Sequence, residues 1–210
     1  LAMASYPTFN PNALGNTHDP GRRNRAVQDI YEPGSTFKVV TIAAALEEHV
    51  MTPDTIIDTS PGIFRLPGRV IDEFEGHNYG VLSFTDVIVK SSNVGAIKIG
   101  RQVGTARLSD YVERFGFGRP TSPDFPGESP GIVWDRRKWT ESALASVSMG
   151  YQVGVTPLQM VTAVSTVANG GVLMEPRIIG AVYRDGLRYP VKPKAVRRVI
   201  DSETAATLTS

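Results

Sequence analysis

The sequence contains no cysteine among its 210 residues and only three histidines. Without thiols, the chain has no disulfide framework, no catalytic cysteine and no zinc site built on cysteine. The histidines, His18, His49 and His77, lie too far apart along the chain to form a local pair of metal ligands. We therefore expect neither a metal centre nor another bound cofactor.

An excess of charge of either sign is also missing, because 22 Lys and Arg stand against 21 Asp and Glu, a net charge of +1. This balance gives no electrostatic reason to expect nucleic acid or an anionic membrane surface as a partner. No apolar run approaches the ~18 residues of a membrane span, and the first residues lack the pattern of a signal peptide. The sequence contains no phosphate-binding P-loop, no dinucleotide fingerprint and no Gly-x-Ser-x-Gly motif.

Both ends of the sequence favour an excerpt of a longer protein. The apolar run 1–5 predicts the end of a buried strand, and the last residues fall in a helix that Asp201 and Ser202 open. Residues 6–33, rich in Pro and Gly, predict a long ordered loop. The length suits one domain with a core of its own.

The spacing of apolar residues, together with capping signals, predicts several helices and few strands. The helices are expected at residues 35–48, 83–90, 94–103, 108–115, 140–148 and 156–169. Short strands are expected within 54–82 and at 178–183 and 196–200. The carboxylates in the loop-rich stretch are predicted to be solvated surface residues, namely Asp54, Asp58, Asp72, Glu73 and Glu75.

The segment from Ser35 to Lys38 follows a Pro-Gly turn and opens a long apolar helix. Residues three apart lie on one face of a helix, so the lysine amine can reach the serine hydroxyl. A serine needs a base to act as a nucleophile, and a lysine can serve once burial or nearby positive charge lowers its pKa. The spacing thus indicates Ser35 as nucleophile and Lys38 as base. The same residues also fit a helix cap followed by a solvated lysine.

A second candidate is the turn Ser91-Ser92-Asn93 between two predicted helices. A hydroxyl and an amide two residues apart on a tight turn can point the same way. Ser91 could then relay a proton, while Asn93 could bind a substrate amide and hold the lysine. Both residue types are also common helix caps. Tyr151 is a candidate aromatic wall for a ligand or, alternatively, a packing residue.

Together these motifs resemble those of the penicillin-recognising serine acyltransferases, in which Ser-x-x-Lys is followed by Ser-x-Asn. The sequence around these motifs resembles that of the high-molecular-mass class B penicillin-binding proteins, most of all the division and sporulation transpeptidases. The likeness covers nearly the whole chain in the right order. It rests on five segments: 23–38 (RNRAVQDIYEPGSTFK), 89–95 (VKSSNVG), 125–128 (FPGE), 137–139 (RKW) and 150–159 (GYQVGVTPLQ).

The resemblance implies a peptidoglycan D,D-transpeptidase that acts on D-Ala-D-Ala stem peptides and is acylated by β-lactams. Ser35 would attack the penultimate D-Ala carbonyl with Lys38 as general base. Ser91 would help to protonate the leaving amine, and Asn93 would bind the peptide amide. Tyr151 falls where the family often places an aromatic residue near the substrate. Glu32, beside the nucleophile, is placed with the substrate-binding residues without an assigned role.

One departure from the family pattern is large, because neither Lys-Thr-Gly nor Lys-Ser-Gly occurs in the 210 residues. In the family this signature lies on a strand that supplies one backbone N–H of the oxyanion hole, the other coming from Ser35. Loss of one such donor costs on the order of 100- to 1000-fold in rate. We expect the full-length parent to be the enzyme and this chain alone to be inactive.

Two alternatives stay open. A serine β-lactamase would need rapid attack of water on the acyl-enzyme, and no Glu followed closely by Leu-Asn, the class A setting, is present. A β-lactam sensor that is acylated once would keep Ser35 and Lys38. Only the sequence likeness to the division transpeptidases argues against it.

The fold that the resemblance implies is the α+β fold of β-lactamases and D,D-transpeptidases, as a helix-rich subdomain with part of the five-stranded sheet. Residues 1–34 would hold the end of a strand and an entry loop, 35–170 the helical subdomain, and 171–210 strands and the start of a helix. The parent would be anchored in the cytoplasmic membrane with its catalytic domain on the outer face. Its partners would be stem peptides, β-lactams, a septal glycosyltransferase and division proteins, with no nucleic acid.

Overall fold

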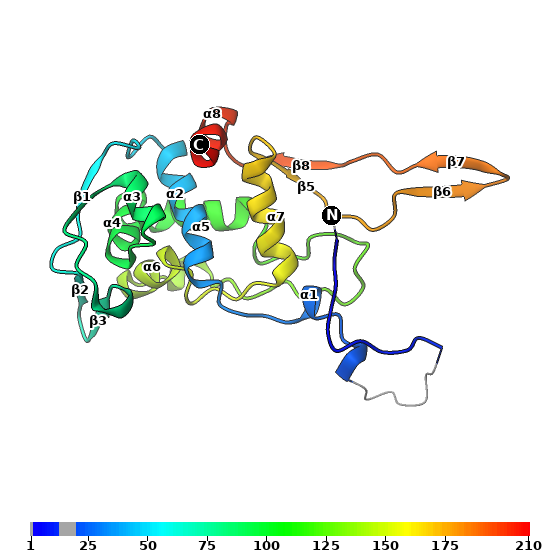
Figure 1. Ribbon diagram of the computed structural model, residues 1–210, viewed down its shortest axis with the longest axis horizontal. Helices are drawn as coiled ribbons and strands as arrows, with labels where there is room; N and C mark the ends of the chain where they lie inside the picture. Colours follow the sequence, from blue (N-terminus) through cyan, green and yellow to red (C-terminus); the bar gives the residue numbers. More distant parts are fainter. Residues whose placement is uncertain (1, 13–19) are drawn as a thin grey trace.

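The centre of the molecule is helix α2 (Lys38–Glu47), in which every residue from Val40 to Leu46 is buried. The structure, a computed structural model, describes residues 2–12 and 20–210. A helix that is apolar all round is stable when other elements cover it on every side. Helices α4, α5 and α8 pack against α2 and provide this cover (Figure 1). Helix α2, which directly follows Ser35, is therefore the central helix around which the other helices pack.

Four of the other described helices begin at a residue whose side chain accepts a backbone N–H of the first turn. Thr156 caps its helix through a complete capping box with Gln159, as predicted, and Ser83 and Ser92 cap theirs by accepting a backbone N–H. Apart from α2, the helices of the described chain are α1 (Arg25–Gln28), α3 (Phe84–Val89), α4 (Asn93–Val103), α5 (Thr105–Arg114), α6 (Glu141–Ser148), α7 (Pro157–Ala168) and α8 (Ser202–Thr209). The 3-10 turns are η1 (Pro20–Arg22), η2 (Gly34–Phe37), η3 (Phe74–Gly76) and η4 (Arg136–Lys138).

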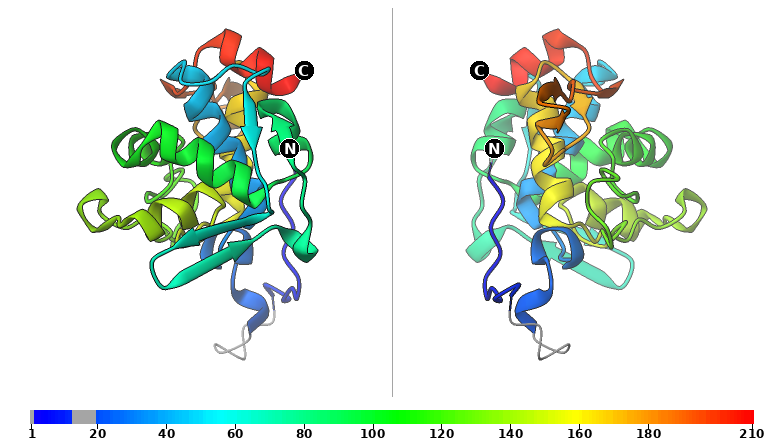
Figure 2. Two further views of the ribbon diagram at one scale, coloured as in Figure 1. Left: turned by 90° about the vertical axis from the view of Figure 1, so that its left-hand side faces the viewer. Right: turned by 90° about the vertical axis from the view of Figure 1, so that its right-hand side faces the viewer.

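The described strands form separate antiparallel pairs rather than one sheet. They are β1 (Ile56–Asp58) with β4 (Val81–Ser83), β2 (Ile63–Leu66) with β3 (Arg69–Asp72), β5 (Val172–Met174) with β8 (Ala195–Arg198), and β6 (Ala181–Arg184) with β7 (Leu187–Pro190). The β2–β3 hairpin lies at the edge of the helical body (Figure 2). Its buried side chains Phe64, Leu66 and Ile71 share a small core with α4 and α6, and this core fixes the end of β3 beside the start of α4.

Most predicted helices are confirmed, with boundaries shifted by a few residues. The strand predicted at 1–5 is wrong for residues 2–5, which have no strand neighbour to supply hydrogen bonds and are mostly exposed. Leu1 and His18 lie outside the described residues. The loop predicted at 6–33 contains η1 and α1. The strand predicted at 178–183 lies at 181–184 and forms a hairpin, whose Asp185-Gly186 turn has both φ angles positive.

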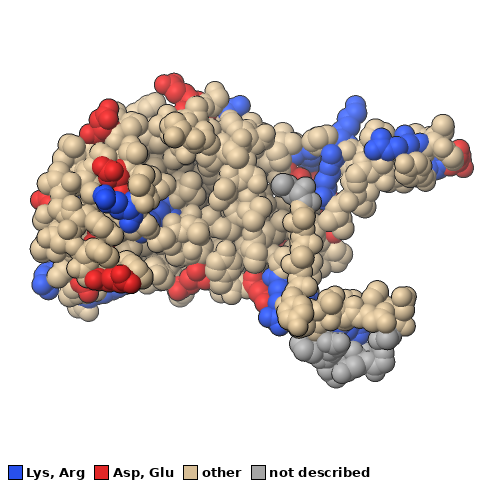
Figure 3. All heavy atoms as spheres, viewed as in Figure 1, with Lys and Arg blue, Asp and Glu red and all other residues tan. Residues whose placement is uncertain are grey.

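The balanced charge of the whole sequence conceals a local basic segment. Residues 177–198 contain seven basic residues against one acid, Asp185 at the hairpin turn. Figure 3 shows Lys and Arg side chains gathered along the protruding β6–β7 hairpin. Within the described part of the chain, no helix has the length and apolar character needed to cross a membrane.

Gly100 is a point where α4 lies against both α6 and α2. A Cβ at this position would stand 1.9 Å from Ser148 Oγ and 2.8 Å from Ser148 Cβ. We expect Gly100→Ala to lower the free energy of unfolding by about 2 kcal/mol, since overpacking a dense core forces neighbouring helices apart. Urea denaturation measures the effect. Gly180→Ala is the matched control, because nothing lies within 4 Å of its added methyl group. Equal stability of the two variants would contradict this account of the packing.

Candidate active site

The amine of Lys38 is the central group of the candidate site. Its side chain lies in the first turn of α2 and the residue is only 1% exposed. Nζ donates to Ser91 O at 2.5 Å, to Ser91 Oγ at 3.0 Å and to Asn93 Oδ1 at 2.9 Å. The two motifs that the sequence singled out, 53 and 55 residues apart, therefore meet at one nitrogen.

Burial lowers the pKa of Lys38 to about 8, and the carboxylate of Glu73 opposes part of this shift. A charged amine donates three hydrogen bonds and has no lone pair, so its three contacts occupy it fully. A neutral amine keeps two donors and gains a lone pair that can accept a proton. The lowered pKa makes this neutral, basic form accessible near physiological pH.

The backbone of Ser91 explains how one residue reaches Lys38 twice. Ser91 lies between α3 and α4 with φ at +54°, in the left-handed region that is uncommon for residues other than glycine. Its own N–H and that of Ser92 donate back to Ile88 O and Val87 O, which ends α3. The carbonyl and the hydroxyl of Ser91 are thereby left facing the lysine.

Glu73 corrects a sequence-based prediction, because it is not a solvated carboxylate but is 3% exposed. Its oxygens accept hydrogen bonds from Ser92 Oγ, from the Asn93 N–H at 2.5 Å and from the Val94 N–H at 3.3 Å. A carboxylate at a helix N-terminus satisfies N–H groups that have no partner within the helix. The loop-rich sequence around Glu73 gave no signal of this role, since its partners lie about 20 residues away.

Asn93 is held from two sides. Its Nδ2 donates to Asp72 O at 3.0 Å, which leaves Oδ1 directed at Lys38. The end of β3 thus fixes both the backbone and the side chain of the Ser-x-Asn motif. The other carboxylates of this stretch, Asp54, Asp58, Asp72 and Glu75, are exposed as predicted.

Ser35 lies in the η2 turn, directly before α2 and one helical turn from Lys38. Its side chain is exposed, and its hydroxyl makes no hydrogen bond with the residues that the structure describes. The preceding Gly34 has φ at +55° and donates its N–H to Gly150 O at 2.9 Å. A Cβ on Gly150 would stand 2.1 Å from Gly34 O, so the two backbones touch. The backbone of the turn is therefore closely packed, while the Ser35 hydroxyl stays accessible.

Tyr151 and Glu32 lie beside this turn. Tyr151 is 45% exposed, and its hydroxyl stands 4.0 Å from the place of a Cβ on Gly34. Glu32 Oε1 accepts the Gln152 N–H at 2.8 Å, at a residue whose φ is +58°. The structure thus gives Tyr151 an open aromatic face near Ser35, and gives Glu32 a part in holding the corner that carries Tyr151.

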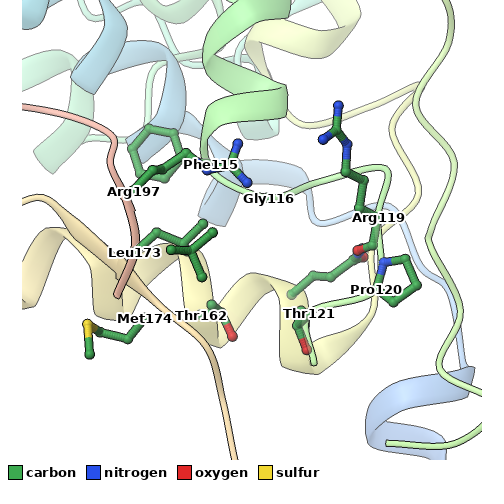
Figure 4. A pocket seen from close by; sticks show the side chains of 11 residues that line it. Phe115, Gly116, Arg119, Pro120, Thr121, Thr162, Leu173, Met174 and Arg197 are labelled. Atoms are coloured by element: carbon green, nitrogen blue, oxygen red, sulfur yellow. The ribbon is translucent and has the colours of Figure 1, made fainter. Parts of the chain in front are cut away.

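A cavity of about 70 Å³ lies away from these residues, between α5, α7 and β5 (Figure 4). None of the candidate site residues lines it. Its walls include Phe115, Thr162 and Leu173. Within the described ranges, no group of three or more His, Asp or Glu side chains is placed to hold a metal ion.

The family is decided by comparison with known proteins. The whole chain, residues 1–210, matches the penicillin binding protein transpeptidase domain. The chain belongs to this family. Both the family and the α+β fold that the sequence predicted are thereby confirmed.

Individual members of the transpeptidase family agree. Peptidoglycan D,D-transpeptidase FtsI of Escherichia coli (strain K12) is 36% identical over 172 residues, which make up 82% of this chain and 29% of that protein. Stage V sporulation protein D of Bacillus subtilis is 35% identical over 210 residues, 98% of this chain and 32% of that protein. Penicillin-binding protein A from M. tuberculosis, solved as an imipenem acyl-enzyme complex, matches with a TM-score of 0.88 at 29% identity, covering 100% of this chain and 52% of that one. This chain spans about a third of the length of the two curated relatives.

Replacement of Glu73 tests its part in holding the site. In Glu73→Gln an amide N–H₂ would face donors that now meet a carboxylate oxygen. We expect a loss of about 2 kcal/mol in the free energy of unfolding, measured by urea denaturation. Glu75→Gln, an exposed neighbour, is the control and should change stability by less than about 0.5 kcal/mol. An unchanged stability in Glu73→Gln would show that the start of α4 does not depend on this carboxylate.

Proposed function

We propose that this chain carries the acyl-transfer site of a peptidoglycan D,D-transpeptidase, with Ser35 as its nucleophile. The observation that carries the proposal is the buried Lys38 amine, with a pKa of about 8, hydrogen-bonded to Ser91 and Asn93 one turn from the exposed Ser35. A basic amine, a hydroxyl relay and an accessible hydroxyl are the groups that serine acyl transfer needs.

In the first half of the reaction, Ser35 Oγ attacks the carbonyl carbon of the penultimate D-Ala of a stem peptide. Neutral Lys38 takes the hydroxyl proton as the C–O bond forms. The tetrahedral intermediate collapses and the C–N bond to the terminal D-Ala breaks, with a proton delivered to the leaving amine through Ser91. Asn93 Nδ2 is engaged by Asp72 O, so its Oδ1 is the atom directed into the site.

In the second half, the amine of another stem peptide attacks the ester carbon and releases Ser35. The proton of the attacking amine returns through the same groups, and a new peptide bond cross-links the two strands. A β-lactam enters by the first half alone, since opening its ring leaves no separate leaving group to depart. The imipenem acyl-enzyme of the M. tuberculosis relative supports this branch.

We propose for the whole protein a location at the cytoplasmic membrane, with the catalytic domain on its outer face. There it would cross-link glycan strands together with a septal glycosyltransferase and division proteins. The support is the family match and the likeness to proteins named as peptidoglycan transpeptidases and as a sporulation protein.

A fluorescent penicillin tests the nucleophile directly. We expect a covalent adduct at Ser35, located by peptide mass spectrometry, and none in Ser35→Ala. We expect it to form slowly, because the Lys-Thr/Ser-Gly signature is not among the 210 residues and one missing oxyanion donor costs about 100- to 1000-fold in rate. Thr36→Ala is the matched control, since this exposed neighbour donates to Pro33 O. Labelling at another residue, or unchanged labelling in Ser35→Ala, would reject the proposal.

The pH dependence of labelling tests the base. Lys38 is reactive when neutral, and burial lowers its pKa to about 8, so the rate should rise with pH and level off above that value. Because the Glu73 carboxylate raises this pKa, Glu73→Gln should shift the rise to lower pH. Labelling reactions stopped at successive times at each pH, and quantified by gel fluorescence, give the pH profiles of the wild type and of Glu73→Gln. A rate independent of pH in this range would exclude Lys38 as the base.

A further inference from the structure

A pocket of about 120 Å³ opens beside the candidate site, between η4 and α6. Gln152 forms part of its wall and directly follows Tyr151. The N–H of Gln152 is the group that Glu32 holds, so the pocket begins one residue beyond the corner that contacts the Ser35 turn. The other lining residues are Trp134, Lys138, Trp139, Thr140, Ala143 and Val147.

The two tryptophans of this pocket differ in their surroundings. Trp139 is half-buried and packs against the main core, and its Nε1 donates to Trp134 O at 3.0 Å. This bond fixes the backbone at Trp134, whose residue remains 55% exposed. The result is a large aromatic ring at the pocket wall, whose face is partly open to solvent and partly covered by the Lys138 amine. Such a face binds the apolar face of a ring well, because little conformational freedom is lost.

Lys138 is the one charged residue among those that line the pocket. Its Nζ stands 5.9 Å from the centre of the Trp134 ring. The neighbouring cations are occupied, since Arg136 pairs with Asp110 at 3.4 Å and Arg137 with Asp135 at 2.5 Å. Lys138 forms no ion pair within the described part of the chain. Its charge also acts on Asp135, whose pKa is lowered mainly by hydrogen bonds from Arg137. The pocket therefore offers a ring platform next to a positive charge that is not held in an ion pair.

We propose that this pocket is a subsite for the sugar-bearing end of a peptidoglycan stem peptide, in which a sugar ring stacks on Trp134 and a peptide carboxylate pairs with Lys138. The inference rests on the proposed function, because it takes as ligand a peptide with free carboxylates joined to a sugar. Its place beyond Tyr151 separates it from Ser35, where the D-Ala end of the same peptide reacts.

Muramyl dipeptide, one sugar ring joined to two amino-acid residues with one free carboxylate, is the probe. The chain has two tryptophans and both line the pocket, so tryptophan fluorescence reports on this site alone. We expect a saturable change in emission, with the same dissociation constant from calorimetry. Chitotriose, which has sugar rings but no carboxylate, should bind several-fold more weakly.

Two variants separate the ring from the charge. By calorimetry, Trp134→Ala should weaken muramyl dipeptide binding about tenfold and Lys138→Gln about fivefold. Lys90→Gln is the matched control, because Lys90 Nζ lies over Tyr79 at 5.8 Å, outside the pocket, and binding should be unchanged. Circular dichroism confirms that each variant is folded.

Three results would overturn the proposal: calorimetric binding without a change in emission, no binding by either method, or equal affinity in wild type, Trp134→Ala and Lys138→Gln. Chitotriose binding as tightly as muramyl dipeptide would remove the role given to Lys138. Penicillin carries no sugar, so its labelling of Ser35 tests the proposed function separately. Labelling at Ser35 with no muramyl dipeptide binding rejects the subsite alone. Muramyl dipeptide binding together with labelling that is unchanged in Ser35→Ala rejects the acyl-transfer role of Ser35.

Discussion

Burial of the Lys38 amine is the constraint on which the rest of the site depends. A lysine removed from water is costly unless its donors are satisfied or its charge is lost. Here the contacts come from another part of the chain, the turn between α3 and α4. The central helix can therefore pack in its observed position only when that turn is correctly formed, which couples the folding of the core to the assembly of the site.

The basicity of Lys38 is set by two opposed effects, burial and the nearby carboxylate of Glu73. A carboxylate paired directly with the amine would stabilise the charged form and hold the proton. Glu73 instead directs its oxygens to Ser92, Asn93 and Val94, so its field reaches the amine while its hydrogen bonds serve α4. The same side chain thus supports the helix that carries Asn93 and limits how far the pKa of Lys38 falls.

Local signals predicted most helices well, because caps, apolar spacing and Gly or Pro breaks act within a few residues of each other. The capping box at Thr156 and Gln159 is an example. Glu73 escaped the sequence because its role appears only when β3 is brought beside α4. Strand β7, which pairs with β6, was also not predicted, although the sequence contains Asp185-Gly186, a typical hairpin turn. The strand predicted at 1–5 failed for the opposite reason, since apolar character alone supplies no hydrogen-bonding neighbour.

The backbone contact between Gly34 and Gly150 limits which substitutions this part of the site can accept. A side chain at Gly150 would overlap the Gly34 carbonyl, and one at Gly34 would have to adopt a positive φ that is uncommon for residues other than glycine. The serine turn and the aromatic corner are consequently held at a fixed spacing by this backbone contact. A substitution meant to widen or narrow the entrance would therefore act at the tyrosine ring itself or at residues farther out, and would leave the distance between these two backbones unchanged.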